Sequence, residues 1–223
     1  MLGVDTCGPS GSVALAQIEG EIAPILDQTE LAGRSYSAIL VAAVAELLER
    51  HHASLRDLHA IVVVNGPGSF TGVRVGLSAV KGLAEPEGIP VAAVSRLEVM
   101  AAKTGVASSA LDAHRHEVFL RLKEADSEAR ELLAGAGELE EFDSGGGPIA
   151  VCDEDAARLL QTAWPNAELA RTDAPTAADA IGFAIKRVLA GEFDDLVLLD
   201  GHYLRRSDAE IFGDPATAPA RRV

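Results

Sequence analysis

The sequence predicts an α/β protein with mixed sheets flanked by helices, divided into two lobes. The order of its segments is the first reason: three strands, a helix, a strand and a second helix follow one another in the first half of the chain. The second reason is a junction of strand, turn and helix. Four consecutive apolar residues, Ile61–Val64, indicate a buried strand, and a glycine- and proline-rich turn leads from them into a helical pattern.

Residues 1–104 are expected to form the N-terminal lobe. Its predicted strands are Leu2–Asp5, Ser12–Ala16, Ile22–Thr29, Ala60–Val64 and Ile89–Val94. Pro24 requires the third of these to lie at a sheet edge or a bulge. Helices are predicted at Ser35–His51 and Gly72–Ala84, and Ser95 and Glu98 have the spacing of a capping box that opens another helix.

Residues 105–206 are expected to form the C-terminal lobe. A hairpin with arms Ala107–Leu111 and Val118–Leu122 is followed by a loop at 144–148, a strand at Ile149–Val151 and helices at Glu154–Gln161 and Ala177–Leu189. Gly213, Pro215 and Pro219 interrupt residues 207–223, which predicts a loosely ordered tail.

Composition excludes several classes of protein. The hydrophobic content of 48% is ordinary for a globular chain, and no apolar run reaches membrane-spanning length. Met1 leads directly into a strand rather than a basic signal segment, so a cytoplasmic protein is expected. Cys7 and Cys152 form neither a disulfide framework nor a metal spacing. The net charge of −15 opposes a polyanion, so this chain is not expected to be the main grip on any nucleic acid.

The most informative segment is the turn and helix start at residues 65–76, which reads NGPGSFTGVRVG. Gly66 and Gly68 flank Pro67 where the chain must turn sharply, and the following helix start presents backbone N–H groups that favour negative charge. Gly72, Gly76 and Ala79 form a smooth strip that would let another backbone approach the helix closely.

This segment resembles the GPGSFTGxRxG signature of the TsaB (YeaZ-type) family, a subunit of the bacterial machinery that makes threonylcarbamoyladenosine (t6A) in tRNA. The order of elements also resembles the actin-like ATPase fold, in which two related lobes face a cleft. Further resemblance to the family covers most of residues 1–125 and a short C-terminal piece: Asp5-Thr6 with Ser12–Leu15, Asp112–Phe119, and Tyr203-Leu204-Arg205. His114 and Phe119 stand where arginine and tyrosine are usual in the family, and Tyr36 stands where histidine is usual, so no family role transfers to Tyr36.

In ATPases of this fold the hairpin equivalent to residues 5–15 cradles phosphate. The candidate phosphate or nucleotide contacts are therefore Asp5, Thr6, Gly66, Gly68 and Ser69. A simple hairpin turn is the alternative, and Pro9 favours it. No cofactor is expected, with ATP or ADP at a subunit junction left open.

Catalysis by this chain is not expected. The catalytic paralogue of the family, the TsaD type, carries V-N-H-x-x-x-H after the strand equivalent to Ile89–Val94, and its two histidines hold a metal. Arg96 and Met100 occupy those positions here, and a guanidinium repels a cation. The spacing of His114 and His116 invites a metal, but two histidines in a hairpin loop are more often solvated. No catalytic residues and no metal are therefore predicted.

The helix at Ser35–His51 points to a partner instead. Residues 38–45 contain no polar side chain, so this part of the helix is apolar all round and one side needs cover. Burial within one large domain is the alternative. The expected interface residues on this helix and the next are Ile39, Leu40, Ala43, Val44, Leu47, Gly72, Val73, Gly76, Ala79 and Val80.

The resemblance implies a non-catalytic activating subunit that forms a homodimer in isolation and a heterodimer with the TsaD-type paralogue. The complex would transfer a threonylcarbamoyl group to N6 of adenosine 37 in tRNA, with a TsaE-type ATPase as a further candidate partner. The paralogue would supply most of the tRNA contact, and Arg205, Arg206, Arg221 and Arg222 are the basic candidates in this chain. The alternative is a small ATP-dependent kinase or ATPase of the same fold.

Overall fold

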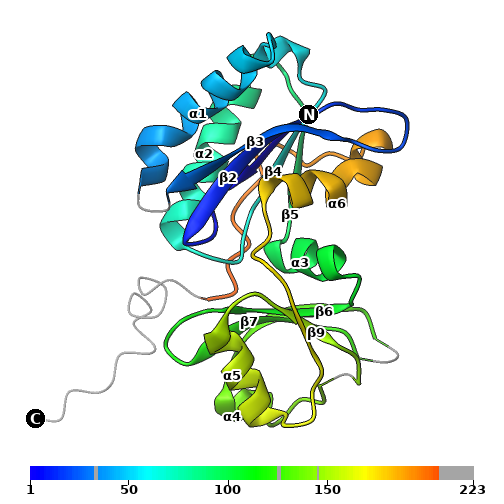
Figure 1. Cartoon of the computed structure of the whole chain (residues 1–223). Coiled ribbons are helices and arrows are strands. Elements are labelled where there is room, and N and C mark those ends of the chain that lie inside the picture. Colours follow the sequence, from blue (N-terminus) through cyan, green and yellow to red (C-terminus); the bar gives the residue numbers. More distant parts are fainter. Residues whose placement is uncertain (33–34, 125–126, 145, 206–223) are drawn as a thin grey trace, which may run out of the picture.

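The computed structural model describes residues 1–32, 35–124, 127–144 and 146–205. Two five-stranded mixed sheets lie one beyond the other, each with helices on its faces (Figure 1). Their strand orders are β3-β2-β1-β4-β5 and β8-β7-β6-β9-β10. In both, three antiparallel strands follow one another and two parallel strands extend the sheet from the first of them. The predicted fold class is therefore confirmed, and the two sheets share one topology.

The first sheet is close to the sequence prediction. Its strands are β1 (Leu2–Asp5), β2 (Ser10–Ala16), β3 (Ile25–Ala32), β4 (Ile61–Val64) and β5 (Val91–Val94). Strand β3 lies at the sheet edge, as expected, but it begins at Ile25, just after Pro24, rather than at the predicted Ile22. Its register with β2 shifts at Leu15/Ala16. Helices α1 (Tyr36–Arg50) and α2 (Phe70–Ala84) cover one face of this sheet. The short 3-10 helix η2 (Leu55–Asp57) lies between α1 and β4 in the chain.

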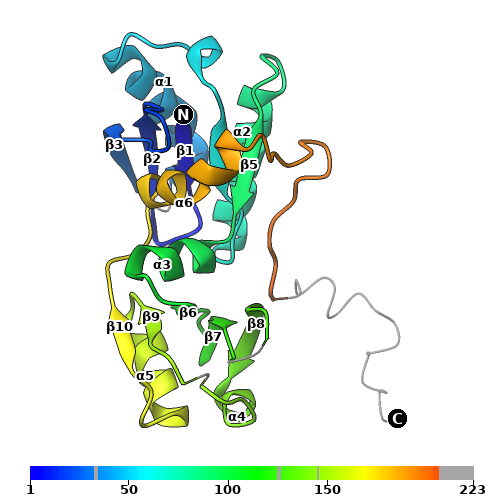
Figure 2. The same ribbon diagram turned by 90° about the vertical axis from the view of Figure 1, so that its right-hand side faces the viewer.

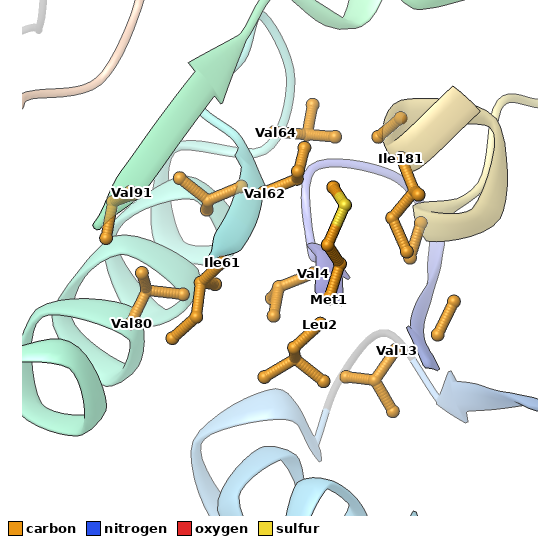
Figure 3. Packing of buried hydrophobic residues seen from close by; sticks show 14 of the residues in the cluster. Met1, Leu2, Val4, Val13, Ile61, Val62, Val64, Val80, Val91 and Ile181 are labelled. Atoms are coloured by element: carbon orange, nitrogen blue, oxygen red, sulfur yellow. The ribbon is translucent and has the colours of Figure 1, made fainter. Parts of the chain in front are cut away.

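The opposite face of the first sheet is covered by α6 (Ala177–Leu189), which comes from the far end of the chain (Figures 1 and 2). Ile181 of α6 packs into the same core as Met1 and Leu2 (Figure 3). The absence of a side chain at Gly3 allows this contact, because a Cβ there would lie 2.6 Å from the carbonyl oxygen of Ala177. The structure thus differs from the expected assignment of all of residues 105–206 to a second lobe, since a sheet with two apolar faces needs a helix on each.

The second sheet contains β6 (Ser108–Asp112), β7 (Glu117–Leu122), β8 (Arg130–Gly135), β9 (Ile149–Val151) and β10 (Leu169–Arg171). Helices α4 (Ala136–Leu139) and α5 (Glu154–Ala163) pack on one side of it, and α3 (Arg96–Thr104) lies on the other side, between the two sheets. The short elements β8, α4 and β10 were not predicted from the sequence. The tail at residues 207–223 and Arg206 lie outside the described residues.

Within the described parts of the chain, none of the helices combines the length and apolar character that a membrane crossing requires.

Candidate functional site

A cleft of about 1040 Å³ lies between the lobes. It is lined by the turn after β1, the turn before α2, the start of α3, the β6–β7 turn and residues 202–205, which run back across the lobe junction. Of the candidate phosphate contacts named from the sequence, Gly68 and Ser69 line this cleft, whereas Asp5, Thr6 and Gly66 do not.

Asp5 and Thr6 are buried and held by the protein itself. The backbone N–H of Cys7 donates to Oδ1 of Asp5 at 2.8 Å, and Nε of Arg96 lies 3.4 Å from its Oδ2. The Thr6 hydroxyl donates to the carbonyl of Gly72 at 2.7 Å. Neither side chain lines the cleft, so the structure differs from the expectation that Asp5 and Thr6 contact phosphate: their polar groups tie β1 to α2 and α3.

The turn before α2 divides into a structural part and an exposed part. Gly66 has a φ of 118° and is buried close to the carbonyl of His202, so it shapes the chain rather than meeting a ligand. Gly68 and Ser69 line the cleft. The Ser69 hydroxyl is partly committed, because it accepts from the backbone N–H of Gly72 at 3.3 Å as the N-cap of α2.

Arg96 and Met100, which replace the histidines of the TsaD-type motif, are both buried on α3. The ion pair with Asp5 holds Arg96 in the wall of the cleft. Burial raises the pKa of the neighbouring Cys7 thiol well above its ordinary value, so this sulfur is a neutral thiol rather than a thiolate.

The β6–β7 turn carries His114, Arg115 and His116, all with positive φ. His114 is exposed, and its Nδ1 lies 2.7 Å from Oδ2 of Asp112. Among the described residues, no group of three or more His, Cys, Asp or Glu side chains is arranged to hold a metal ion. The turn thus presents one histidine at the surface, His114, which is paired with Asp112.

Tyr36, which departs from the family pattern, fills a structural role. Its hydroxyl donates to the carbonyl of Gly8 at 2.9 Å, and burial raises its pKa to about 12. This bond ties the start of α1 to the turn after β1.

Most of the expected interface residues face the core of this chain. Leu40, Ala43, Val44 and Leu47 of α1, and Val73 and Val80 of α2, are buried in the first-lobe core, whereas Ile39 and Ala79 are half-buried. The outward face of α1 carries Ser37, Glu46, Glu49 and Arg50 toward its ends and, between them, four apolar residues, Ala38, Val41, Ala42 and Ala45; Val41 is 55% exposed. The apolar surface predicted for α1 therefore exists, but on these four residues, because the periodicity of a helix turns the others inward.

The small-residue strip of α2 is also used inside the chain. A Cβ added at Gly72 or Gly76 would collide with Thr6, so these glycines let β1 approach α2. The close backbone approach predicted from the sequence occurs, and the approaching segment is this chain's own β1–β2 turn. Gly72 and Gly76 are buried and do not present a surface to a partner.

Two hollows of about 460 Å³ each flank Val41 on the α1–α2 face. One is lined mainly by apolar residues of α1 and by Leu83, with Glu49 and His52 also in its wall. The other is lined by Phe70, Val75 and Ala79 of α2 together with the polar Ser37, Arg74 and Ser78. Val41 is thus exposed between two hollows, and the side chains of a partner could fill those hollows.

A polar cluster at the lobe junction was missed from the sequence. Glu131 on β8 accepts from the Ser95 hydroxyl at 2.7 Å, from His202 at 2.8 Å and from Arg121 at 3.2 Å. Burial works to raise the pKa of Glu131, but the hydrogen bonds from His202 and Ser95 bring it below its ordinary value. Ser95 caps α3 as predicted, accepting from the Leu97 N–H, but Glu98 pairs with Arg121 instead of completing a capping box.

Residues 202–205, which include the YLR segment, cross from one lobe to the other. The His202 N–H donates to the carbonyl of Asn65 at 2.7 Å, and the Tyr203 ring lies 5.1 Å from that of Phe70. Arg74 stacks over Phe70 at 3.7 Å, and its Nε donates to the Tyr203 hydroxyl at 3.2 Å. Arg205 pairs with Glu117 on β7. This segment therefore fastens the first lobe to the second.

The family model described as TsaD: tRNA N6-adenosine threonylcarbamoyltransferase matches residues 23–148, more than half of the chain. The tRNA threonylcarbamoyladenosine biosynthesis protein TsaB of Bacillus subtilis is 36% identical over 126 residues, which cover 55% of this chain and 54% of that protein. TsaB of Escherichia coli K12 is 34% identical over 125 residues, 53% of this chain and 52% of that protein. The match thus spans about half the length of these curated relatives.

A solved structure from Pseudomonas aeruginosa, described as an uncharacterized protein with similarity to peptidase YEAZ, covers 92% of this chain and 98% of its own. It superimposes with a TM-score of 0.73 at 27% identity, which supports the actin-like, two-lobed fold inferred from the order of elements. The chain belongs to the family of the tRNA N6-adenosine threonylcarbamoyltransferase model, and within it is a protein of the TsaB/YeaZ type.

Proposed function

We propose that this chain is a non-catalytic partner subunit in the transfer of a threonylcarbamoyl group to N6 of adenosine 37 in tRNA. It docks through the outward face of α1 and α2 onto a catalytic paralogue of the TsaD type and, in isolation, onto a second copy of itself. The single observation that carries the proposal is this exposed apolar face, centred on Val41 between its two hollows.

The outward face of α1 has the character of a protein interface. Four consecutive outward positions on the helix carry Ala38, Val41, Ala42 and Ala45, with no charge among them. A helix at a protein surface ordinarily keeps its outer side polar, so an apolar outer side favours burial against a partner. The half-buried Ile39 and Ala79 border this face, whereas the buried members of the predicted interface set support it from beneath.

The environment of α3 supports a subunit without transfer chemistry of its own. Arg96 and Met100 stand where the TsaD-type motif has its metal-binding histidines, and the Arg96 guanidinium is held in place by Asp5. A fixed positive charge at this position opposes a bound cation. The metal-dependent step is therefore assigned to the paralogue.

The charge of the chain favours an indirect role toward tRNA. Because the chain has a net charge of −15, its surface repels polyanions, so the paralogue supplies most of the tRNA contact. Arg205 is engaged with Glu117, and Arg206, Arg221 and Arg222 lie outside the described residues. We place the complex in the cytoplasm, with a TsaE-type ATPase as a further partner and ATP or ADP bound, if at all, at a subunit junction.

The kinase or ATPase alternative receives less support. Its candidate phosphate contacts included Asp5 and Thr6, and both are buried in bonds to the protein. Asp153, at the opposite wall of the cleft, is likewise occupied as the N-cap of α5, accepting from Ala156 at 2.7 Å.

Reconstitution tests the proposal. The paralogue, tRNA and threonylcarbamoyl-adenylate are combined with and without this protein, and modified tRNA is measured by mass spectrometry. The proposal expects efficient modification only when the protein is present, and none from this protein without the paralogue. Equal modification in its absence would show that it is not an activating subunit.

A further inference from the structure

We propose that the exposed turn after α6 docks into an apolar pocket of another protein, and that lysine and arginine side chains border this pocket. The side chains that enter the pocket are those of Val197 and Leu198, called here the Val197–Leu198 pair. The inference goes beyond the proposed partner role, because this turn lies beside β5 at the edge of the first sheet and not on the outward face of α1 (Figure 2).

The Val197–Leu198 pair is unusually exposed for apolar residues. Val197 is 85% exposed and Leu198 78%, whereas the next highest value for a large apolar side chain among the described residues is 62%, at Ile22. A single exposed apolar side chain is normal on a protein surface, but two in succession form a small patch. Burial of this patch against a partner would remove apolar surface from water.

The backbone of the turn holds the pair outward. Oδ1 of Asp195 accepts from the backbone N–H of Val197 at 2.8 Å and from that of Leu198 at 3.4 Å. The Leu199 N–H donates to the carbonyl of Asp195 at 2.8 Å. Leu199 is buried in the core of the first lobe, and Leu196 is partly buried against the same core. Because apolar residues on both sides of the pair are anchored, a partner would meet a turn that is already ordered, which lowers the entropic cost of docking.

The neighbouring edge of the first sheet is closed. The backbone N–H of Asp194 donates to the carbonyl of Val91 at 2.9 Å, and Oδ2 of Asp194 accepts from the Ala93 N–H at 2.7 Å. The guanidinium of Arg187 donates to the carbonyl of Ala93 at 2.8 Å. These contacts occupy the outer edge of β5 at Val91 and Ala93, so a partner cannot add a strand there and must bind the side chains of the turn instead.

The charges around the pair indicate the chemistry of the partner. Three exposed carboxylates lie within a few residues of the pair: Glu192, Asp195 and Asp200. Within the described part of the chain, none of the three forms an ion pair with a cation. Asp194 is already paired with Arg187, and residues 188–201 contain no lysine or arginine. Interfaces match opposite charges across the contact, so the complementary border of the pocket is positive.

The same charges argue against other occupants. A second copy of this chain, with its net charge of −15, would bring like charges together at the turn. Nucleic acid and anionic lipid surfaces would be repelled for the same reason. An apolar centre inside a charged border is the usual arrangement of a protein–protein contact, which favours a basic protein as the occupant.

Site-specific photo-crosslinking in the cells that make this protein tests the first step. Leu198 is replaced by p-benzoylphenylalanine in the full chain, and the adducts are identified by mass spectrometry. The matched control carries the same replacement at Leu26, which is 45% exposed on β3, at the opposite edge of the first sheet. We expect a protein adduct from position 198 that position 26 does not give. The proposal is wrong if position 198 gives no adduct, or only those that position 26 also gives.

Titration of the purified crosslinked protein tests the second step, because an adduct alone does not show specific docking. Val197→Ser and Leu198→Ser should each weaken binding about tenfold or more, since each removes an apolar side chain from the pocket. Leu26→Ser should leave the affinity unchanged. A rise in salt from about 50 to about 500 mM should weaken binding of the parent protein several-fold, because it screens the charged border.

The variants should fold normally, since Val197 and Leu198 are at the surface, and urea denaturation checks this. Three results would overturn the proposal: an affinity that survives both serine substitutions, an affinity that does not respond to salt, or a crosslinked protein that proves to be a second copy of this chain.

Discussion

Arg96 and Asp5 form a buried ion pair that joins the start of α3 to the end of β1. Nε of Arg96 lies 3.4 Å from Oδ2 of Asp5, and the two side chains are 6% and 1% exposed. Gly8 fits against the guanidinium, since a Cβ there would collide with it. The pair fixes a positive charge at the position where the resemblance to the TsaD type would have placed a metal ligand.

Removing one partner of this pair should be costly. Asp5→Asn leaves the Arg96 charge buried and uncompensated, so we expect the free energy of unfolding to fall by about 3–5 kcal/mol in urea denaturation. Asp27→Asn is the matched control, because Asp27 pairs with Arg50 at the surface and should lose much less. Similar losses in the two variants would show that the Asp5–Arg96 pair is not a stabilising contact of the fold.

Two glycines of α2, Gly76 and Gly82, should respond to replacement by alanine with opposite changes in the free energy of unfolding. At Gly76 an added methyl group would collide with the Thr6 hydroxyl, whereas a Cβ at Gly82 would meet nothing within 4 Å. Gly76→Ala should therefore lower the free energy of unfolding by about 1–3 kcal/mol. Gly82→Ala should raise it by roughly 0.5–1 kcal/mol, because alanine is the better helix former. A Gly76→Ala variant as stable as Gly82→Ala would mean that the turn after β1 does not pack tightly against α2 at Gly76.

The His202–Glu131 contact should make the junction of the lobes sensitive to pH. The hydrogen bond to Glu131 raises the pKa of His202 above 6.5, although partial burial opposes this, and the pKa of Glu131 lies below 4.5. A raised histidine pKa contributes stability that is complete below pH 6.5 and is lost as the pH rises through the folded pKa. A lowered carboxyl pKa contributes stability above pH 4.5 that is lost as the pH falls.

Together, these two pKa shifts mean that the contact between His202 and Glu131 contributes most to the stability of the fold between pH 4.5 and 6.5. Urea denaturation of the parent and of His202→Gln should show a larger difference at about pH 6 than at about pH 8.5. His59→Gln, at an exposed histidine outside this cluster, is the control for the loss of an imidazole. A His202→Gln difference that does not change with pH would argue that His202 is neutral in the folded protein.

The fold was largely predictable because its strands and helices carry clear local patterns. The four buried residues of β4, the glycine-rich turn and the helix α6 were each predicted from a short stretch of sequence. The position of α6 could not be predicted in this way, because nothing in the local sequence Ala177–Leu189 indicates which of the two sheets its apolar face will cover. Strands β8 and β10 are short or partly exposed, which weakens the alternation that would mark them.

The candidate site was predictable only in part, for a related reason. The sequence named the turn that carries Gly68 and Ser69, which do line the cleft. It did not bring Glu131 together with His202, since 71 positions separate them, nor Arg96 with Asp5. Contacts between side chains so far apart depend on tertiary packing, and a single sequence contains no local signal for them.

The interface prediction can be tested at the residue that the structure exposes. Leu40 is 1% exposed, so a charge there would disrupt the core and would not test the surface of α1. Val41→Glu places the charge on the outward face, between the two hollows. We expect light scattering to find a dimer for the parent protein and a monomer for Val41→Glu, because the buried carboxylate would have no partner in the dimer.

Val197→Glu is the matched control, because Val197 is 85% exposed in the turn beyond α6, beside the bridge between Asp194 and Val91 of β5. It introduces the same side chain and should leave the dimer intact. Both variants should unfold at urea concentrations close to that of the parent, since each residue is at the surface. If Val41→Glu remains dimeric, or if Val197→Glu dissociates instead, two copies of the chain meet elsewhere, and the outward face of α1 is free for the paralogue alone.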